Sequence, residues 1–357
     1  MRFPEFSGEW TKIKLGDLGG FFSGGTPSSS RKDFYGGEIP FIRSGELHSD
    51  STALSITKEA YDSCSAKMVN KGDLLLALYG ATSGDISISR ICGAINQAIL
   101  CIRPQYMDAY FIKSLWEKHK KHILETYLQG GQGNLSSEII KNISFFFPNS
   151  DEQVKISRLI HIIDDRIETQ SKIIEEQETL LKSLADSLIS SQVANMALND
   201  CVVARSSTMK ESELENPGPF PVFGASGLCG YNNEALEESD SILVTKDGSG
   251  VGTCQYATGA HSFLGTLCSL TAKDGVYLPY VYYALLNFNF ASFKTGLAIP
   301  HIYFKDYGKA VIYCPSYDEQ VRIASGLEKL EAKINTDKEL LKQYQLQKEY
   351  LLSRMFI

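Results

Sequence analysis

Few residues of this chain stand in a pattern that could perform catalysis. The eight cysteines include no C-x-x-C pair and the six histidines no H-x-x-x-H pair, although zinc and redox sites need ligands that close together. Gly248 to Gly252 starts like a dinucleotide-binding loop, but Thr253 stands where the third glycine belongs. The tetrapeptide that starts at Asn216 departs from the N-P-P-aromatic motif of adenine methyltransferases at its last two positions. We therefore expect no catalytic site, no metal and no cofactor on this chain.

Length and composition predict a protein of two or more domains. The 357 residues exceed a typical single domain, and 43% of them are hydrophobic. The sequence contains no apolar run of about 18 residues, and its first residues lack the apolar core of a secretory signal. We therefore expect a cytoplasmic protein without a membrane partner. Because the net charge is −7, any nucleic-acid contact must be local or shared with a more basic partner.

One short stretch occurs almost unchanged twice, 167 positions apart. Pro148 to Ile156 reads PNSDEQVKI, and Pro315 to Ile323 reads PSYDEQVRI. Each stretch opens a long segment that looks helical, and we expect Asp151 and Asp318 to cap the first turns. A helix-start signal would by itself explain the DEQ triplet. It does not explain why the whole unit recurs, which indicates an internal duplication.

Both long segments carry an apolar stripe with a heptad period. The polar interruption at Gln170 recurs at Asp337, 167 positions later. We predict that the stripe residues form the core between two paired helices: Ile156, Ile160, Ile163, Ile167, Ile174, Leu181, Leu184 and Leu188 in the first, and Ile323, Leu327, Leu330, Ile334, Leu341, Tyr344 and Leu351 in the second.

Helices of about 36–40 residues would be about 55–60 Å long, too long to bury such a stripe in one small domain. We expect them to pair as an antiparallel coiled coil, with the globular units at opposite ends and a pseudo-two-fold internal repeat. The predicted boundaries are residues 1–150 for the first domain, 151–195 for the first helix, 196–317 for the second domain and 318–357 for the second helix.

The two globular units resemble each other. Asp73 to Gly84 and Asp240 to Gly252 each run from an acidic residue through a short apolar stretch into a G-x-x-x-G loop. Strand-like segments and one short amphipathic helix follow in both units. Short strands, glycine loops and few helices predict an α+β domain. The strand order does not follow from these patterns.

Together these features resemble the specificity (S) subunit of type I DNA restriction–modification systems. The resemblance covers nearly the whole chain. It is carried by the doubled layout, the P-x-x-D-E-Q helix entries, the tract KLGDLGGFFSGGTPS, the glycine loops and the segment from Asn134 to Ser136. The second unit departs from the pattern, because its opening has no clear SGGTPS counterpart and GLAIPHI replaces GGQGNLS.

The resemblance implies a non-catalytic protein with two target recognition domains. Each domain would read one half of a split site in double-stranded DNA, and the helix pair would set the spacing and dock two adenine methyltransferase (M) subunits. Motor-nuclease (R) subunits would add cleavage, with S-adenosylmethionine and ATP bound by the partners. Outward residues of the first helix would serve docking: Arg166, Glu168, Glu175 and Glu176.

Side chains that pair with base edges or phosphates, located in or near the glycine and serine loops, are the expected DNA contacts. In the first unit these are Thr26, Ser28, Ser30, Arg31, Lys32, Arg43, Ser44, Tyr79, Thr82, Arg90, Gln132 and Asn134. In the second unit they are Lys246, Asp247, Ser249, Gln255, Tyr256, His261, Lys294 and His301. Each of them is also explained as a solvated loop residue.

Two other functions fit the same features. The chain could serve a type II-like or solitary adenine methyltransferase that has no motor-nuclease. It could also be a coiled-coil scaffold that binds only proteins, which the acidic net charge favours.

Overall fold

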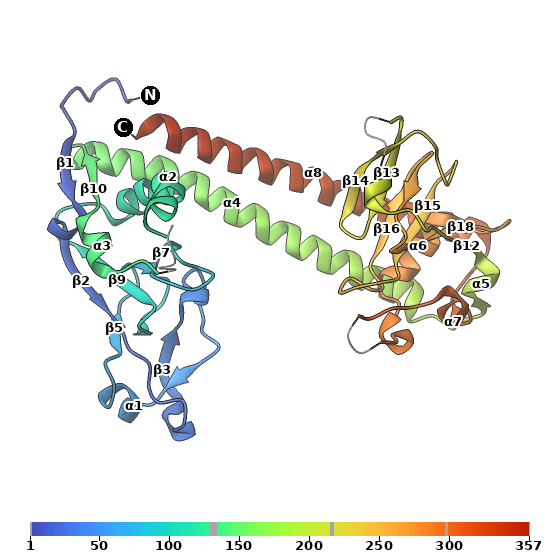
Figure 1. Ribbon diagram of the computed structural model, residues 1–357, viewed down its shortest axis with the longest axis horizontal. Helices are drawn as coiled ribbons and strands as arrows, with labels where there is room; N and C mark the ends of the chain where they lie inside the picture. Colours follow the sequence, from blue (N-terminus) through green and yellow to red (C-terminus); the bar gives the residue numbers. More distant parts are fainter. Residues whose placement is uncertain (1, 129–133, 215–217, 297–298, 357) are drawn as a thin grey trace. The chain divides into compact units, whose positions relative to one another are not determined.

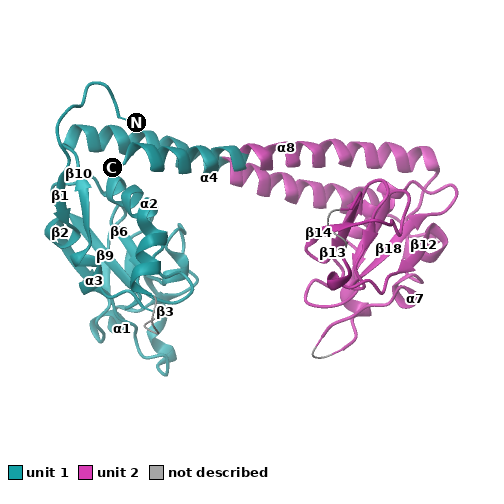
Figure 2. Cartoon of the chain, turned by 45° about the horizontal axis from the view of Figure 1, so that its top comes forward, with its two compact units in different colours: residues 1–169, 341–357 teal, residues 170–340 magenta. Residues whose placement is uncertain are grey.

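The computed structural model describes residues 2–128, 134–214, 218–296 and 299–356. The chain divides into two compact units (Figures 1 and 2), one made of Met1–Thr169 with Leu341–Ile357 and the other of Gln170–Leu340. Each unit contains a β-rich domain and part of each long helix. The predicted α+β class, with two similar domains and two packed long helices, is confirmed.

The first unit contains two four-stranded sheets and a β-ribbon. One sheet is antiparallel, in the order β2 (Gly19–Ser23), β9 (Ile99–Pro104), β6 (Leu74–Ala77) and β7 (Ile86–Ile88). The other has the order β4 (Ser55–Ile56), β3 (Tyr35–Ile42), β8 (Gly93–Ile95) and β5 (Lys67–Val69), with β3 and β8 parallel. The ribbon pairs β1 (Thr11–Lys14) with β10 (Ser144–Phe147). The helices are α1 (Lys58–Asp62), α2 (Ala109–Tyr127), α3 (Ser137–Asn142) and the start of α4 (Ser150–Ala185).

The second unit repeats this arrangement. Its antiparallel sheet has the order β12 (Val202–Ser206), β18 (Leu267–Ala272), β15 (Ser241–Thr245) and β16 (Cys254–Ala257). Its smaller sheet has the order β14 (Gly227–Asn232), β13 (Phe220–Gly224) and β17 (Ser262–Phe263), again with one parallel pair. A ribbon joins β11 (Met196–Ala197) to β19 (Val311–Ile312). The helices are α5 (Leu198–Cys201), α6 (Leu278–Leu286), α7 (Phe304–Tyr307), the end of α4 and the start of α8 (Tyr317–Met355).

Strand β6 shows how the first domain is layered. All four of its residues are buried, because both faces of its sheet are covered. Leu74 and Leu76 belong to a core that includes α2 and both long helices, whereas Leu75 and Ala77 belong to a core with the second sheet. The run Leu-Leu-Leu-Ala is therefore uniformly apolar rather than alternating, as expected for a strand buried on both faces.

The repeated DEQ motif attaches each long helix to its domain through the glutamine. Gln153 accepts a hydrogen bond from the Asp108 backbone N–H (3.2 Å) and donates to the Pro148 carbonyl (2.9 Å). Gln320 makes the equivalent bonds to the Tyr277 N–H and the Pro315 carbonyl, both 2.9 Å. Both glutamines are buried, at 2% and 1% exposure. Each therefore joins the start of its long helix to the loop before the short helix, α2 or α6.

The predicted capping by Asp151 and Asp318 is wrong. The long helices begin one residue earlier, at Ser150 and Tyr317, so both aspartates lie inside the first turn. In α4 the cap is Asn149, whose Oδ1 accepts from the Glu152 N–H at 2.9 Å. The acidic side chains still suit the positive end of the helix dipole.

Within each unit the long helices lie against each other. In the first unit Lys348 forms an ion pair with Asp164 (2.7 Å), and the Arg166 guanidinium lies 5.9 Å from the Tyr344 ring centroid. Later positions in α4 thus meet earlier positions in α8, so this pairing is antiparallel. In the second unit Gln177 donates to Asp337 at 2.9 Å. Asp337 is the predicted polar interruption, and hydrogen bonds from Gln177 and Lys333 lower its pKa.

Most of the predicted stripe residues lie in the interior. Those that are buried are Ile156, Ile160, Ile163, Ile174, Leu181, Ile323, Leu327 and Ile334. Those that are partly buried are Ile167, Leu330, Leu341, Tyr344 and Leu351.

The prediction fails for Leu184 and Leu188, which are 38% and 40% exposed. Ala185 and Ile189 are buried instead, four and eight residues after Leu181. The shift coincides with a π-helical turn at Asp186–Ser190, which closes with a Ser191 N–H to Asp186 carbonyl bond of 2.8 Å. A π turn rotates the following side chains away from a regular heptad.

Each domain contains one G-x-x-x-G loop with the same backbone geometry. Gly80, Gly84, Gly248 and Gly252 all have φ between 81° and 96°. The second glycine of each loop also packs tightly. A Cβ on Gly84 would lie 2.8 Å from Leu124 Cδ2, and one on Gly252 would lie 2.7 Å from Phe290 Cβ. These loops therefore require glycine for both backbone conformation and space.

Replacing Gln153 or Gln320, which we call the clasp glutamines, should destabilise the protein. Gln153→Ala or Gln320→Ala leaves a buried N–H and a buried carbonyl without their side-chain partner, so we expect a loss of about 1–3 kcal/mol in unfolding free energy. Urea unfolding measures this loss, with the exposed Gln347→Ala as the matched control. A clasp variant as stable as that control would contradict the assigned role.

Alanine in place of the second glycine of either G-x-x-x-G loop should also destabilise the protein. Gly84→Ala and Gly252→Ala each force a non-glycine residue to positive φ, at about 1–2 kcal/mol, before any steric cost. Thermal unfolding measures the loss of stability. Gly45→Ala is the control, because Gly45 has open space around its Cβ position and no positive φ. Equal melting temperatures for Gly84→Ala and Gly45→Ala would refute the packing argument.

Candidate nucleic-acid interface

In both domains the glycine loop is joined to the segment that precedes the last strand. The Leu135 N–H donates to the Leu78 carbonyl (2.8 Å), and the Ile302 N–H donates to the Lys246 carbonyl (3.0 Å). These bonds accompany isolated β-bridges between Tyr79 and Asn134 and between Asp247 and His301. The structure thus brings together four predicted contact residues in two equivalent pairs. We call the surface around each pair the paired loops of that domain.

The paired loops offer hydrogen-bonding side chains at the surface. Asn134 is exposed and Tyr79 is half-buried, and burial raises the pKa of the Tyr79 phenol, so it remains a donor. In the second domain the His301 ring lies 5.6 Å from the Tyr303 ring. The neighbouring predicted residues are half-buried or exposed: Thr82, Lys246, Ser249 and Lys294. Amide, imidazole and ammonium groups of this kind can pair with base edges or phosphates.

The serine-rich loop of the first domain is held at its base. Thr26 hydrogen-bonds the side chain of Gln97, and Ser28 lies 2.8 Å from Ser30, oxygen to oxygen. The glycines before this loop are tightly packed, since a Cβ on Gly25 would lie 2.1 Å from Ser65 Oγ. Lys32 is exposed. The loop therefore presents hydroxyl groups and an ammonium group from a fixed base.

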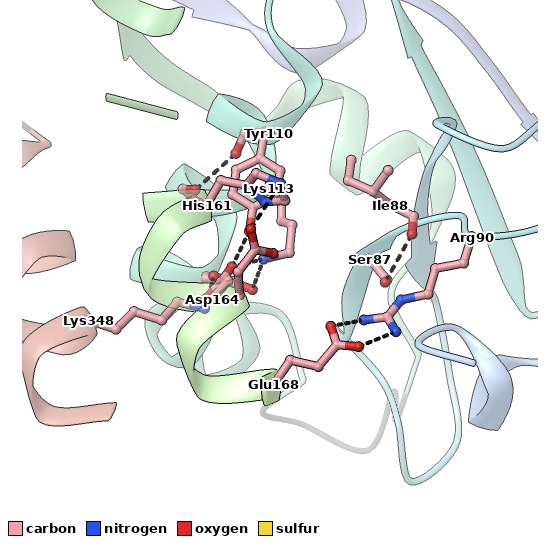
Figure 3. A network of polar contacts seen from close by, with 12 residues as sticks. Ser87, Ile88, Arg90, Tyr110, Lys113, His161, Asp164, Glu168 and Lys348 are labelled. Atoms are coloured by element: carbon pink, nitrogen blue, oxygen red, sulfur yellow. Dashed lines mark hydrogen bonds and ion pairs between the residues drawn. The ribbon is translucent and has the colours of Figure 1, made fainter. Parts of the chain in front are cut away.

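The three predicted arginine contacts are each paired with a carboxylate. Arg31 bonds Asp33 (2.5 Å) and Arg43 bonds Glu46 (3.0 Å) beside Ser44, the first residue of a short 3₁₀ helix. Arg90 forms a bidentate pair with Glu168 of α4 at 2.8 and 2.6 Å (Figure 3). Exposed ion pairs are weak in water, so DNA phosphates can compete for these guanidinium groups. Glu168, one of the predicted docking residues, thus also belongs to this ion pair.

Three predicted contacts of the second domain have structural roles instead. His261 is fully buried, and its ring nitrogens bond Ser241 Oγ (2.9 Å) and the Gly259 carbonyl (2.8 Å). The Gln255 amide donates to the Gly224 carbonyl at 2.9 Å, which ties β16 to β13. The Tyr256 hydroxyl donates to Asp240 at 3.1 Å. His261 therefore lies in the interior of its domain, whereas Gln255 and Tyr256 are half-buried. Gln132 lies outside the described residues.

Sequence reasoning missed several polar and aromatic residues near these loops. Gln97 contacts Thr26, but it stands in a segment read only as a strand. Tyr303 is 48% exposed, and the Lys305 ammonium lies 5.2 Å from its ring centroid. The available signal was an aromatic residue that stands two positions after the predicted His301 and two positions before a lysine.

A charged network lines a cavity of about 680 Å³ in the first unit (Figure 3). Asp164 accepts hydrogen bonds from Tyr110 and Lys113 of α2 and from Lys348 of α8. Burial alone would raise the pKa of Asp164, but Lys113 and Lys348 more than offset it and hold that pKa below its usual value. Burial, followed by the hydrogen bond to Asp164, raises the pKa of Tyr110. Asp164 is therefore a carboxylate anion that binds Tyr110, Lys113 and Lys348 at once.

Among residues 2–128, 134–214, 218–296 and 299–356, no three His, Cys, Asp or Glu side chains gather in a way that could hold a metal ion. In the same part of the chain, no helix is apolar enough over a sufficient length to cross a membrane.

Comparison with known proteins agrees with this geometry. The family model of the type I restriction modification DNA specificity domain matches residues 7–179 and again 191–344. The MjaIX specificity subunit of Methanocaldococcus jannaschii is 28% identical over 50% of this chain, which spans 42% of that relative's length. The EcoprrI specificity subunit of Escherichia coli is 19% identical over 92% of this chain and 88% of its own length.

Solved structures share the fold. The type I S subunit of M. genitalium superposes with a TM-score of 0.68 at 19% identity, covering 100% of this chain and 99% of that one. A chain from a study of the assembly and conformational transition of a type I restriction–modification system gives a TM-score of 0.54 at 13% identity, with 98% of both chains covered. Since the family model matches most of this sequence in two segments, the chain belongs to the DNA specificity (S) subunits of type I restriction–modification systems, the non-catalytic components of these complexes.

Proposed function

We propose that each β-rich domain reads one half of a bipartite, asymmetric DNA site. The observation that carries this proposal is the recurrence of the paired loops on two copies of one fold with different side chains. Tyr79 and Asn134 stand in the first domain where Asp247 and His301 stand in the second. Because different side chains pair with different base edges, two such surfaces select two different half-sites.

The helix pair sets the distance between the half-sites and docks the partners. Two adenine methyltransferase subunits bind its outward faces, and motor-nuclease subunits join where cleavage occurs, with S-adenosylmethionine and ATP bound by those partners. Exposed apolar side chains on α4 support a docking role: Ile173 (37%), Leu180 (49%) and Leu184 (38%). Glu175 and Glu176 are exposed beside them. An apolar patch with a charged rim is typical of a protein interface.

DNA binding in this proposal is shared with the methyltransferase, because the chain itself carries a net charge of −7. The reconstituted complex should bind DNA with a salt dependence steeper than that of the methyltransferase alone. Equal salt dependence, with no sequence preference added by this chain, would favour the protein-binding scaffold instead. A type II-like or solitary methyltransferase partner would give the same binding without ATP-dependent cleavage.

Single substitutions in the paired loops should each change one half of the recognised motif. Asn134→Ala removes an exposed amide from the first domain, and His301→Ala removes an imidazole from the second. A lost base contact relaxes discrimination by about 1–3 kcal/mol at that position. Sequencing methylated adenines in cells that contain the matching methyltransferase reads both halves at once, so the untouched half is the internal control. If either substitution altered both halves, or neither altered any, the assignment of one domain to one half would fail.

Lys32→Ala should weaken DNA binding without changing the motif. An exposed ammonium group in a hydroxyl-rich loop suits a phosphate contact, and losing one such contact lowers the slope of log K against log salt by about one unit. Fluorescence anisotropy over a salt series measures the slope. Lys121→Ala, an exposed position on α2, is the control and should leave the slope unchanged. An unaltered slope for Lys32→Ala, or a changed motif, would rule out the phosphate contact.

A further inference from the structure

A carboxylate recurs at the same position of both long helices, and in each unit it binds the short helix of the domain. Asp164 of α4 and Glu331 of α8 are 167 positions apart, the offset of the sequence repeat. Asp164 accepts from Tyr110 and from Lys113 (2.9 Å) of α2. Glu331 accepts from Tyr282 (3.3 Å) and Tyr283 (2.7 Å) of α6.

The two contacts differ in charge. In the first unit the carboxylate belongs to an ionic network, because Lys113 and Lys348 each also pair with Glu117 at 2.8 Å. In the second unit the donors are two phenols, and burial followed by the Glu331 charge raises the pKa of both Tyr282 and Tyr283, which keeps them protonated. The same position thus holds its short helix by ion pairs in one unit and by phenol hydrogen bonds in the other.

Each carboxylate also lines a cavity between the short helix and the long helices of its unit. The cavity beside Asp164 has a volume of about 680 Å³, and the one beside Glu331 about 210 Å³. Side chains do not fill these spaces, so the part of the short helix beside each carboxylate is held by polar contacts and not by close packing. The carboxylate contacts bridge the gap instead.

Among the polar contacts between each domain and its long helix, two recur at equivalent positions in both units. The clasp glutamine is the first, at Gln153 or Gln320, and the carboxylate lies 11 residues later in both repeats. Eleven residues are about three helical turns, so both points lie on the same face of the helix. Because the two recurring contacts are three turns apart, together they resist rotation of the domain about either one, in addition to the apolar core that α2 shares with the long helices in the first unit.

We propose that Asp164 and Glu331 are positioning residues that fix the orientation of each recognition domain on its long helix and so set how strictly the complex measures the spacer between half-sites. The inference rests on the proposed two-domain reading. A spacer longer or shorter by one base pair shifts the target by about 3.4 Å along the DNA axis. A domain held at both recurring contacts rejects that shift, whereas a domain that has lost the carboxylate contact is held less rigidly and tolerates it better.

The test compares methyl transfer on three duplexes that carry both half-sites with the native spacer, one base pair fewer and one base pair more. The complete methyltransferase complex is assembled with the parent chain, Asp164→Ala, Glu331→Ala or the exposed Glu349→Ala control. We expect Asp164→Ala and Glu331→Ala each to reduce the preference for the native spacer about three- to tenfold. This is the range that loss of hydrogen bonds of ordinary strength produces. The methylation rate of each of these two variants should change less on the native spacer than on the altered spacers, and Glu349→Ala should match the parent.

Glu331→Gln keeps one oxygen that accepts from Tyr283, and its NH2 group can donate to the Tyr282 hydroxyl, so it should restore the spacer preference. Unchanged preference in both alanine variants, or an equal loss of rate on all three duplexes, would overturn the positioning role. Failure of the proposed function itself would look different, because the parent complex would then show no preference for duplexes that carry both half-sites.

Discussion

The burial of two long apolar stripes is the constraint on which the rest of the structure depends. In the first unit the end of α8 completes the domain core, where Leu352, Met355 and Phe356 join Trp10 and Phe111. The Phe356 ring lies 5.0 Å from Phe111 and 6.5 Å from Trp10. At about 25 cal/mol per Å² of apolar surface, such burial outweighs any single polar contact described above. The first domain is thus built from both ends of the chain, and each long helix serves as core element and as connector.

Polar contacts then decide how each domain is held on this apolar framework. The clasp glutamines and the recurring carboxylates satisfy groups that would otherwise be buried unpaired, which makes them directional where the apolar core is not. The duplication preserved these positions while the side chains that meet them changed, from lysine and tyrosine on α2 to two tyrosines on α6. The paired loops changed in the same way. A shared scaffold with divergent contact residues suits a protein that reads two different half-sites.

Much of the fold, and less of the candidate site, was predictable from the sequence. The physical reasons for the successes also explain the failures. The α+β class, the duplication and the helix pairing follow from periodicity and from a fixed offset, which are local properties. The role of Gln153 does not, because its partner N–H at Asp108 belongs to a loop 45 residues away. The heptad pattern failed at Leu188 because this residue lies in a π turn, which apolar spacing does not encode. His261 was misassigned because a buried histidine bonded to Ser241 and an exposed one have the same sequence signature, and the ion pairs of Arg31 and Arg90 likewise depend on the folded chain.

Amide hydrogen exchange on a chain that ends at Leu351 tests the central structural claim most directly. This chain lacks Leu352, Met355 and Phe356 but retains nearly all of α8. Exchange in α2 (Ala109–Tyr127) should then accelerate, because the core that this helix shares with the end of α8 is opened, while β15 and β18 of the second unit keep their protection. Unchanged protection of α2 in the shortened chain would contradict the account, since the end of α8 would then not be part of the first domain's core.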